Sequence, residues 1–287
     1  MEALSPLPDD VLEMGRALIP KPAFLVGCAR SGTSILGEAL AEHPRIAYLF
    51  EASAIWNDLV PDRPDHRLTA ADANPEVARA IYRALADAAG APRGVLLEKN
   101  PKHVIRIPFL DALFPHAKFV HIIRDGRDTV ASLMFRNRGP RWGHLEIPGW
   151  RELLAAHPEK NHIRCAHQWR YAVSTARADA RALDPARCRE VRYEDLIRDP
   201  RATVAGILQF LELEPARAVD AFLEKIQDET RGSYHARRQV RHYVDDHARR
   251  VGRYRENLTV EEIAEVEAVC GDLLVELGYG PLESRPL

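Results

Sequence analysis

A loop near the N-terminus has residue types and spacing suited to holding an anion. Residues 27–34 read Gly-Cys-Ala-Arg-Ser-Gly-Thr-Ser, which has the glycine spacing of the phosphate-binding motif G-x-x-x-x-G-K-S/T. Thr33 stands where that motif has its lysine, which in nucleoside-triphosphate enzymes reaches the β- and γ-phosphates. The cation of this loop is instead Arg30. The loop therefore predicts a phosphate-bearing nucleotide whose reactive end differs from a Mg²⁺-bound triphosphate.

The flanking sequence predicts a strand before this loop and a helix after it. Residues 24–26 are a short apolar run typical of a buried parallel strand. Apolar residues then recur at helical spacing over 35–40, until His43 and Pro44 end the pattern. The loop thus leads into a helix N-terminus, where unpaired N–H groups and the positive end of the helix dipole favour an anion.

A second charged turn follows another predicted buried strand. Residues 118–123 are rich in β-formers and end at Arg124, after which Val130, Leu133 and Met134 indicate a helix. In parallel sheets, ligands bind beyond the carboxyl ends of the strands, so Arg124 and Arg30 should face the same crevice. Two separate phosphate-binding sites predict a nucleotide that carries phosphates at two positions.

These motifs together resemble those of sulfotransferases that use 3′-phosphoadenylyl sulfate (PAPS). Residues 27–36 are similar to the family's 5′-phosphosulfate loop, and Arg124 with Ser132 to its 3′-phosphate motif. Residues 98–101, 191–196 and 251–258 resemble its Lys-x-Pro segment, its Tyr-Glu-Asp-Leu signature and its C-terminal cofactor-closing segment. The order and spacing of these motifs are nearest to those of the tyrosylprotein, bacterial and carbohydrate sulfotransferases, which have arginine in the loop.

The resemblance implies a role for each matching residue. The 5′-phosphosulfate would be held by Arg30, Ser31, Gly32, Thr33 and Ser34. The 3′-phosphate would be held by Arg124, Ser132 and Arg136, with Tyr193 near the adenine and Arg253 near the phosphates. Arg136 lies one helical turn beyond Ser132, so both side chains can point to one side. Arg30 and Lys99 would stabilise the bridging oxygen and the departing phosphate of a loose in-line transfer, a scheme that needs no metal.

The acceptor hydroxyl also needs a base, and two residues compete for that role. Glu51 lies at the separation from Arg30 that tyrosylprotein sulfotransferases have for their catalytic glutamate, and it is our first choice. His103 is the alternative, since cytosolic sulfotransferases place a histidine just after the corresponding lysine. Here Pro101 occupies that slot and His103 comes two positions later.

The chain of 287 residues is predicted to form one α/β domain with the architecture of P-loop NTPases. A composition of 46% hydrophobic and 29% charged residues suffices for a full core. We expect three layers, in which helices flank a parallel central sheet. Strands are expected near 23–27, 46–49, 94–98, 118–123 and 188–193, and further helices over 75–89, 104–113, 162–182, 201–211, 216–228 and 260–277.

Three stretches are expected to cover the site rather than to build the sheet. Residues 57–74 and 137–160 resist assignment, and long loops in compact domains are commonly lids or binding loops. Trp142 and Trp150 could line an acceptor pocket or pack the second loop onto the body. Arginines gather between 231 and 258, as in a segment that closes over an anionic cofactor or on a solvated face.

Composition excludes several other classes of function. The formal net charge of −2 argues against a general nucleic-acid binder. The four cysteines lack metal-ligand spacing, and no stretch approaches the roughly 18 apolar residues of a membrane span. The acidic N-terminus lacks a secretory signal, so we expect a cytoplasmic protein.

Two other functions fit parts of the sequence. A P-loop nucleotide enzyme such as a small-molecule kinase is opposed by Thr33, and a non-catalytic nucleotide-binding relative by the joint presence of Arg30, Glu51 and Lys99. The acceptor, which can be a small molecule, a carbohydrate or a peptide, is not encoded in local motifs, nor is the oligomeric state.

Overall fold

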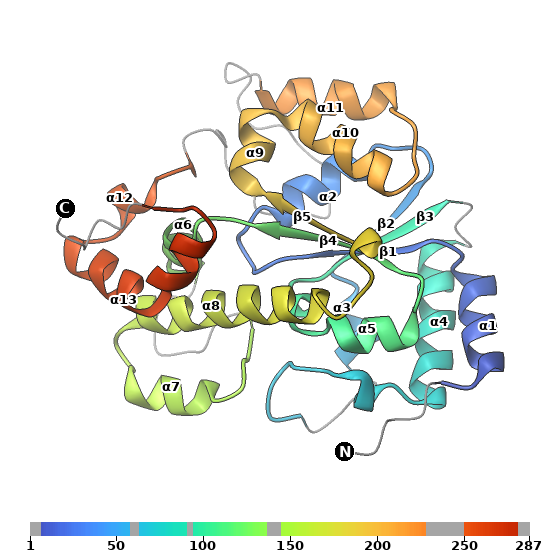
Figure 1. The fold of residues 1–287 in the computed structure, drawn as a ribbon, viewed down its shortest axis with the longest axis horizontal. Coiled ribbons are helices and arrows are strands. Elements are labelled where there is room, and N and C mark those ends of the chain that lie inside the picture. The colour runs from blue at the N-terminus through green and yellow to red at the C-terminus, as the bar shows by residue number, and fades with distance from the viewer. Residues whose placement is uncertain (1–6, 58–62, 91–93, 137–144, 228–249, 281–287) are drawn as a thin grey trace.

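A five-stranded sheet lies at the centre of the computed structural model, which describes residues 7–57, 63–90, 94–136, 145–227 and 250–280 (Figure 1). For residues 57, 135, 136 and 225–227 only the backbone is described. The strands are β1 (Pro22–Val26), β2 (Ile46–Phe50), β3 (Val95–Lys99), β4 (Lys118–Ile123) and β5 (Cys188–Arg192). All neighbouring strands are parallel, in the order β2-β3-β1-β4-β5, so their carboxyl ends meet at one edge.

Helices cover both faces of the sheet (Figure 1). One face packs against α1 (Asp9–Leu18), α4 (Pro75–Ala89), α5 (Ile107–Leu113), α6 (Gly126–Arg136), α8 (Asn161–Ala180) and α13 (Val260–Glu276). The other packs against α2 (Thr33–Ala41), α9 (Tyr193–Arg198), α10 (Pro200–Phe210) and α11 (Arg217–Gln227). The predicted three-layer α/β architecture is confirmed.

Strand β1 forms the rigid base of the glycine loop that follows it. All five of its residues are buried, and successive side chains point to opposite faces of the sheet. Phe24 belongs to the core on the α4 and α8 side, where its ring centroid lies 5.7 Å from those of Phe114 and Phe119. Leu25 belongs to the core under α2 and α10. Burying each of these large apolar side chains contributes about 1.5–3 kcal/mol.

Prolines and glycines explain two differences from the expected helices. The helix expected over 104–113 is a 3-10 turn (Pro101–Ile105) followed by α5, because the ring of Pro108 would clash with the carbonyl of Val104 in a continuous helix. The stretch 137–160, expected to be irregular, contains α7 (Trp150–Ala156), which begins after Gly149 in a left-handed conformation with φ 77°.

Three further differences concern the ends and the number of the helices. Tyr193, expected at a strand end, is the first residue of α9, because the extended Arg192 serves directly as its N-cap. The single-turn helix α3 (Ser53–Asn57) was not anticipated, since five residues show no periodicity. The helix α1 was not anticipated either.

The two stretches expected as binding loops contact each other. Trp150 donates its indole hydrogen bond to Pro64 O at 2.9 Å, and Glu146 N donates to His66 Nδ1 at 2.9 Å. The first stretch also contains a 3-10 turn (Ala70–Asp72) with a capping box between Thr69 and Asp72. Trp150 thus packs one loop on the other, whereas residues 58–62 and 137–144, including Trp142, lie outside the described residues.

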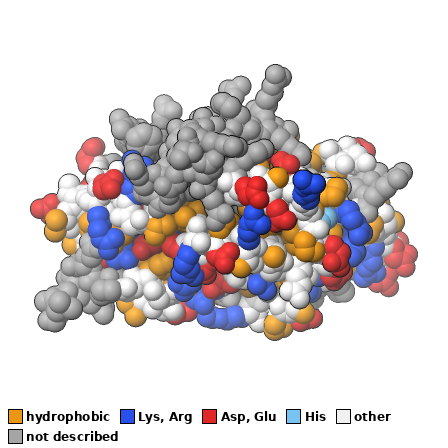
Figure 2. Space-filling view, turned by 90° about the horizontal axis from the view of Figure 1, so that it is seen from above, with side chains coloured by type: hydrophobic (Ala, Val, Ile, Leu, Met, Phe, Trp, Pro, Cys, Tyr) orange, Lys and Arg blue, Asp and Glu red, His pale blue; other side chains and the backbone are white. Residues whose placement is uncertain are grey.

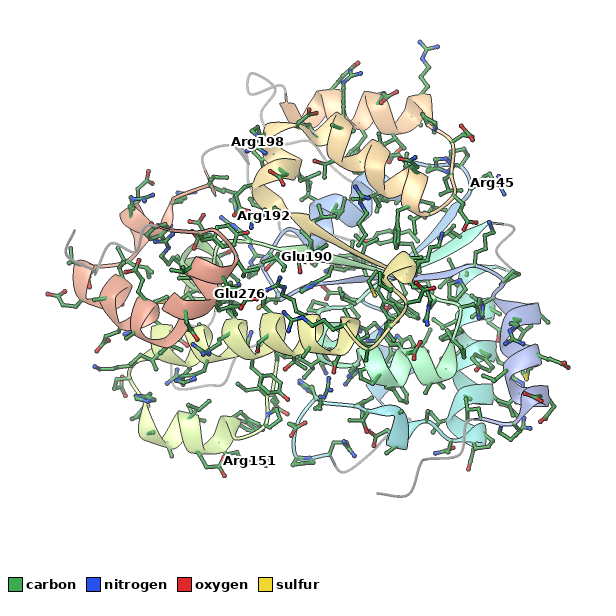
Figure 3. The ribbon with its side chains drawn as sticks, viewed as in Figure 1. Arg45, Arg151, Glu190, Arg192, Arg198 and Glu276 are labelled. Atoms are coloured by element: carbon green, nitrogen blue, oxygen red, sulfur yellow. The ribbon has the colours of Figure 1, made fainter. Side chains whose placement is uncertain are left out.

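The last described helix returns the chain to the sheet. A capping box between Thr259 and Glu262 begins α13. Near the end of α13, Glu276 pairs with Arg177 of α8, which also pairs with Glu190 of β5, at 2.6 and 2.9 Å; both glutamates are labelled in Figure 3. The short α12 (Tyr254–Asn257) precedes α13 and packs against α6. Residues 250–258 are therefore held beside the end of β4.

Charged side chains of both signs are interspersed over the described surface in Figure 2. This mixed pattern matches the small net charge of the sequence. Among the described helices, none has the length and apolar character that a bilayer crossing requires.

Candidate active site

The carboxyl edge of the sheet collects one candidate residue from each strand. Arg30 and Arg124 follow β1 and β4, Glu51 follows β2, Lys99 ends β3 and Tyr193 follows β5. The chain leaves β1 toward β2 and leaves β4 toward β5, so the connections of these two neighbouring strands diverge. Such divergence opens the crevice in which parallel α/β sheets bind ligands.

The glycines of the loop allow close approach to neighbouring elements. A Cβ atom at Gly27 would lie 2.6 Å from Ile122 O, and one at Gly32 would lie 2.4 Å from the Tyr193 ring. Gly32 has φ 95° and is the N-cap of α2, with no side-chain cap. Larger residues at either position would push the loop away from β4 or α9.

The backbone of the loop is shaped to receive an anion. Arg30, like Gly32, has a positive φ, in its case 74°. Left-handed residues in a turn direct neighbouring backbone N–H groups toward one concavity, which can hold an anion. Ser31 Oγ is fully buried and has no hydrogen-bond partner among the described residues. A buried hydroxyl without a partner is costly, so a ligand oxygen at this place would satisfy it.

Arg124 and Arg30 lie together, as the sequence predicted. The guanidinium of Arg124 donates from Nη1 to Arg30 O at 3.3 Å and lies 4.6 Å from the centroid of the Tyr193 ring. Arg30 Nε donates to Ser132 Oγ at 3.1 Å. Arg124 is 5% exposed, and its Nε has no partner in the described part of the chain. Arg124 Nε is thus a second buried donor without a partner among the described residues, and it lies where the 3′-phosphate is expected to bind.

Lys99 joins the loop to the candidate base. Its Nζ donates to Glu51 Oε1 at 2.5 Å and to Ser34 Oγ at 3.2 Å, and it lies 4.4 Å from the Phe50 ring centroid. The Lys99 side chain is 2% exposed, whereas that of Glu51 is 40% exposed. The carboxylate can therefore meet a molecule arriving from solvent while the ammonium stays under it.

Burial dominates the electrostatics of Lys99. It lowers the pKa of the ammonium below the ordinary value of 10.5, an effect that Glu51 and Glu98 oppose and Arg30 reinforces. Burial likewise raises the pKa of the Tyr193 hydroxyl, although Arg124 opposes this shift.

The alternative base His103 lies inside the core. It is fully buried in the 3-10 turn after β3, with its ring 4.5 Å from that of Trp56 and its Nε2 2.8 Å from Glu98 Oε2. An acceptor hydroxyl cannot reach an imidazole enclosed in this way. The displacement by two positions from Pro101 thus moves the histidine from the edge of the sheet to its interior.

Asp128 is a site residue that the sequence analysis missed. Its two carboxylate oxygens accept hydrogen bonds from Gly252 N at 2.8 Å and Tyr254 N at 2.9 Å, and its Oδ2 lies 3.6 Å from Arg124. Arg124 Nη2 also donates to Arg250 O at 2.5 Å. The available signal was that Asp128, in the first turn of α6, comes four residues after Arg124. Together they fasten the C-terminal segment beside the loop.

Of the other two expected cofactor ligands, only Arg253 has a described side chain, and it points to Glu256 rather than into this cluster. Arg253 Nε lies 3.6 Å from Glu256 Oε2, and 43% of its side chain is exposed. The side chain of Arg136 lies outside the described residues, as do residues 228–249, which include most of the arginine-rich segment. Within the described ranges, no group of three or more His, Cys, Asp or Glu side chains is arranged to hold a metal ion.

Comparisons with known proteins identify the family of this chain. The model of the sulfotransferase family matches residues 22–217. Nodulation protein NoeE of Sinorhizobium fredii is 29% identical over 93% of this chain and 68% of its own length, and the protein-tyrosine sulfotransferase of Drosophila melanogaster is 27% identical over 66% and 38%. The chain thus spans about two thirds of NoeE and well under half of the fly protein.

A solved structure also shares the fold. Mouse sulfotransferase SULT7A1, complexed with PAP, aligns over 94% of each chain with a TM-score of 0.51 and 13% identity. The family match covers more than half of the chain and includes the loop, the base candidate, Lys99, Arg124 and Tyr193. The chain described here belongs to the sulfotransferase family.

Proposed function

We propose that this protein transfers a sulfuryl group from PAPS to an acceptor hydroxyl or amine by in-line displacement. The observation that carries the proposal is the Lys99 ammonium, which contacts both the exposed carboxylate of Glu51 and the hydroxyl of Ser34 at the start of α2. A base, a cation and an anion-binding loop are thereby adjacent. This is what transfer between a hydroxyl and a phosphosulfate requires.

The arrangement of buried donors supports PAPS as the sulfuryl donor. Ser31 Oγ and Arg124 Nε are buried donors that have no partner among the described residues, one in the loop and one after β4, as two phosphate-binding sites require. We assign the 5′-phosphosulfate to residues 30–34 and the 3′-phosphate to Arg124 and Ser132, with Tyr193 against the adenine. The mouse relative of the same fold is complexed with PAP.

In the proposed reaction, Glu51 removes the proton of the acceptor as its oxygen or nitrogen attacks sulfur. Lys99 and Arg30 stabilise the negative charge that grows on the bridging oxygen as the bond to the phosphate breaks. PAP leaves, and the proton stays on Glu51 until it passes to solvent. The 40% exposure of the Glu51 side chain supports both proton transfers.

The acceptor is proposed only as a class. Protein-tyrosine sulfotransferases are among the relatives, and others act on a menaquinone derivative, so a phenol and an aliphatic alcohol both fit. A panel of a tyrosine peptide, 4-nitrophenol, a chitooligosaccharide and a primary alcohol, with radiolabelled PAPS, tests the proposal. Label transfer to at least one of them is expected. Phosphate transfer from ATP with no sulfuryl transfer would instead support the kinase alternative.

We also propose one domain over residues 1–287 and a cytoplasmic location. Support for the location is that none of the four cysteines, all of which lie in the described ranges, forms a disulfide, as in a reducing compartment.

PAP is expected to stabilise the protein without Mg²⁺, because Arg30, Arg124 and the loop N–H groups supply the anion contacts directly. At a concentration of roughly 100 times its Kd, PAP should add about 2.7 kcal/mol to the free energy of unfolding. Thermal unfolding with PAP, with PAP and EDTA, and with ATP and Mg²⁺ measures this. A melting temperature that rises only with ATP and Mg²⁺ would overturn the assignment.

Arg124→Ala is expected to weaken PAP by about 10- to 100-fold, the value of a hydrogen bond between charged partners. Adenosine 5′-phosphosulfate, which lacks the 3′-phosphate, should lose much less. Calorimetric titration of both ligands measures the difference, with Arg181→Ala, whose side chain is 71% exposed just after α8, as the matched control. Equal losses for the two ligands would show that Arg124 does not read the 3′-phosphate.

A further inference from the structure

A buried carboxylate that the proposed reaction does not use lies next to its central pair. Glu98 precedes Lys99 in β3, and because side chains alternate along a strand, it points to the opposite face of the sheet. Its side chain is fully buried. Oε1 accepts a hydrogen bond from Trp56 Nε1 at 3.2 Å, and Oε2 lies 2.8 Å from His103 Nε2, at an angle outside that of a hydrogen bond.

Trp56 connects this carboxylate to the candidate base. It belongs to the single-turn helix α3, which begins two residues after Glu51. Glu51 itself has φ 46°, a left-handed conformation that costs energy in a residue with a side chain. One helical turn is not stable alone, so α3 and the strained residue before it need an anchor in the body of the protein.

That anchor is the ring of Trp56 in the core under β1 and β3. Trp56 is 3% exposed and contacts Phe24 and His103 edge-on, with centroids 6.4 and 4.5 Å apart. Its indole N–H donates its hydrogen bond to Glu98. The peptide bond from Glu98 to Lys99 and the bond from Glu51 N to Lys99 O at 2.7 Å complete a closed ring of contacts.

We propose that Glu98 is a positioning residue that, through Trp56, holds Glu51 at the Lys99 ammonium. The inference rests on the proposed function, since it takes Glu51 and Lys99 as the reacting pair. Burial removes the Glu98 carboxyl group from water, a cost that its contacts with Trp56 and His103 offset, so removing Glu98 leaves both of these groups without their partner. Removing the bond should release α3 and let Glu51 move.

Four variants separate positioning from general destabilisation. Glu98→Met keeps the length of the side chain but leaves the Trp56 N–H without an acceptor, whereas Glu98→Gln keeps an acceptor oxygen. Trp56→Phe removes the donor and keeps an aromatic ring. Tyr82→Phe is the matched control, because it removes a buried hydrogen bond of the same core, from Tyr82 to Leu113 O at 2.5 Å, away from Lys99.

Turnover is measured with radiolabelled PAPS and the panel acceptor that the wild-type protein sulfates fastest. Glu98→Met and Trp56→Phe should each lower kcat by about 10- to 100-fold, the effect of a small misplacement of a reacting group. Their combination should cost no more than either alone. PAP affinity should be unchanged, Glu98→Gln should recover most of the activity, and Tyr82→Phe should retain it.

The proposal is overturned if folded Trp56→Phe keeps wild-type kcat, or if Tyr82→Phe loses as much. It is also overturned if the two losses multiply. An ¹⁵N spectrum provides a readout without activity: the Trp56 indole resonance, assigned by its loss in Trp56→Phe, should shift in Glu98→Met. An unchanged resonance overturns the inference whether or not the protein transfers sulfuryl groups. If the resonance shifts in Glu98→Met but the wild-type protein neither binds PAP nor transfers label, only the proposed function is contradicted.

Discussion

Glu51→Gln is expected to lower turnover by roughly 10²- to 10⁴-fold, the usual contribution of a general base. Cofactor affinity should stay close to that of the wild type, because the amide oxygen can still accept the hydrogen bond from Lys99 Nζ, which measures 2.5 Å in the wild type. Single-turnover transfer from labelled PAPS and a PAP titration measure the two quantities separately.

Two further variants control this experiment. Glu152→Gln removes an exposed carboxylate of α7 and should leave turnover unchanged. His103→Ala removes a ring packed between Phe24 and Trp56, so it should lower the melting temperature more than Glu51→Gln does.

The turnover of Glu51→Gln compared with that of His103→Ala decides which residue is the base. Loss of turnover in folded, PAP-binding His103→Ala, together with an active Glu51→Gln, would transfer the role to His103. Activity in both variants would indicate an acceptor acidic enough to need no base, as a phenol is more readily than a sugar hydroxyl.

Lys99→Met is expected to lower turnover by roughly 10²- to 10³-fold, as the loss of one donor to a developing charge does in other enzymes. The substitution removes the cation between Ser34 and Glu51 and keeps an unbranched side chain of similar length. Lys118→Met, at the opposite end of the sheet on β4, is the matched control and should retain activity. Equal turnover of Lys99→Met and wild type would remove Lys99 from the mechanism.

The pH dependence gives Lys99 a second signature. Since burial lowers the pKa of Lys99 below 10.5, the ammonium is present at low pH and is lost as the pH rises through that lowered value. Turnover should therefore fall on the alkaline side at a pH below 10.5. In Lys99→Arg, the side chain stays charged, so whatever turnover remains should show this alkaline decline only at higher pH. An identical alkaline limb in both proteins would assign the limb to another group.

The strand-to-helix turns could be predicted from the sequence because their determinants are local. Gly27 and Gly32 are five residues apart, and the positive φ of Gly32 and its contact with the Tyr193 ring require glycine. Apolar runs shortly before Arg30 and Arg124 imply parallel strands, and parallel strands bring their ends to one edge. That rule placed the two arginines at one crevice, and the structure adds the hydrogen bond from Arg124 to Arg30 O.

The base could be predicted only as a pair of alternatives. Glu51 and His103 both follow strands at plausible spacing, and no local pattern reports which side chain is enclosed. Burial of His103 depends on Phe24 and Trp56, which come from different parts of the chain. The tertiary structure therefore decided that Glu51 is exposed to solvent and that His103 is enclosed in the core.

By itself, the sequence of this protein determined the three-layer fold and the edge of the sheet at which we propose that the cofactor binds, because backbone conformation and hydrophobic periodicity act over a few residues. Only the tertiary structure decided how the site is held together. The bond from Trp56 to Glu98 spans 42 residues, and that from Tyr254 to Asp128 spans 126. Such contacts form when distant elements pack, and the free energy of that packing is distributed over the whole core rather than written in any one segment.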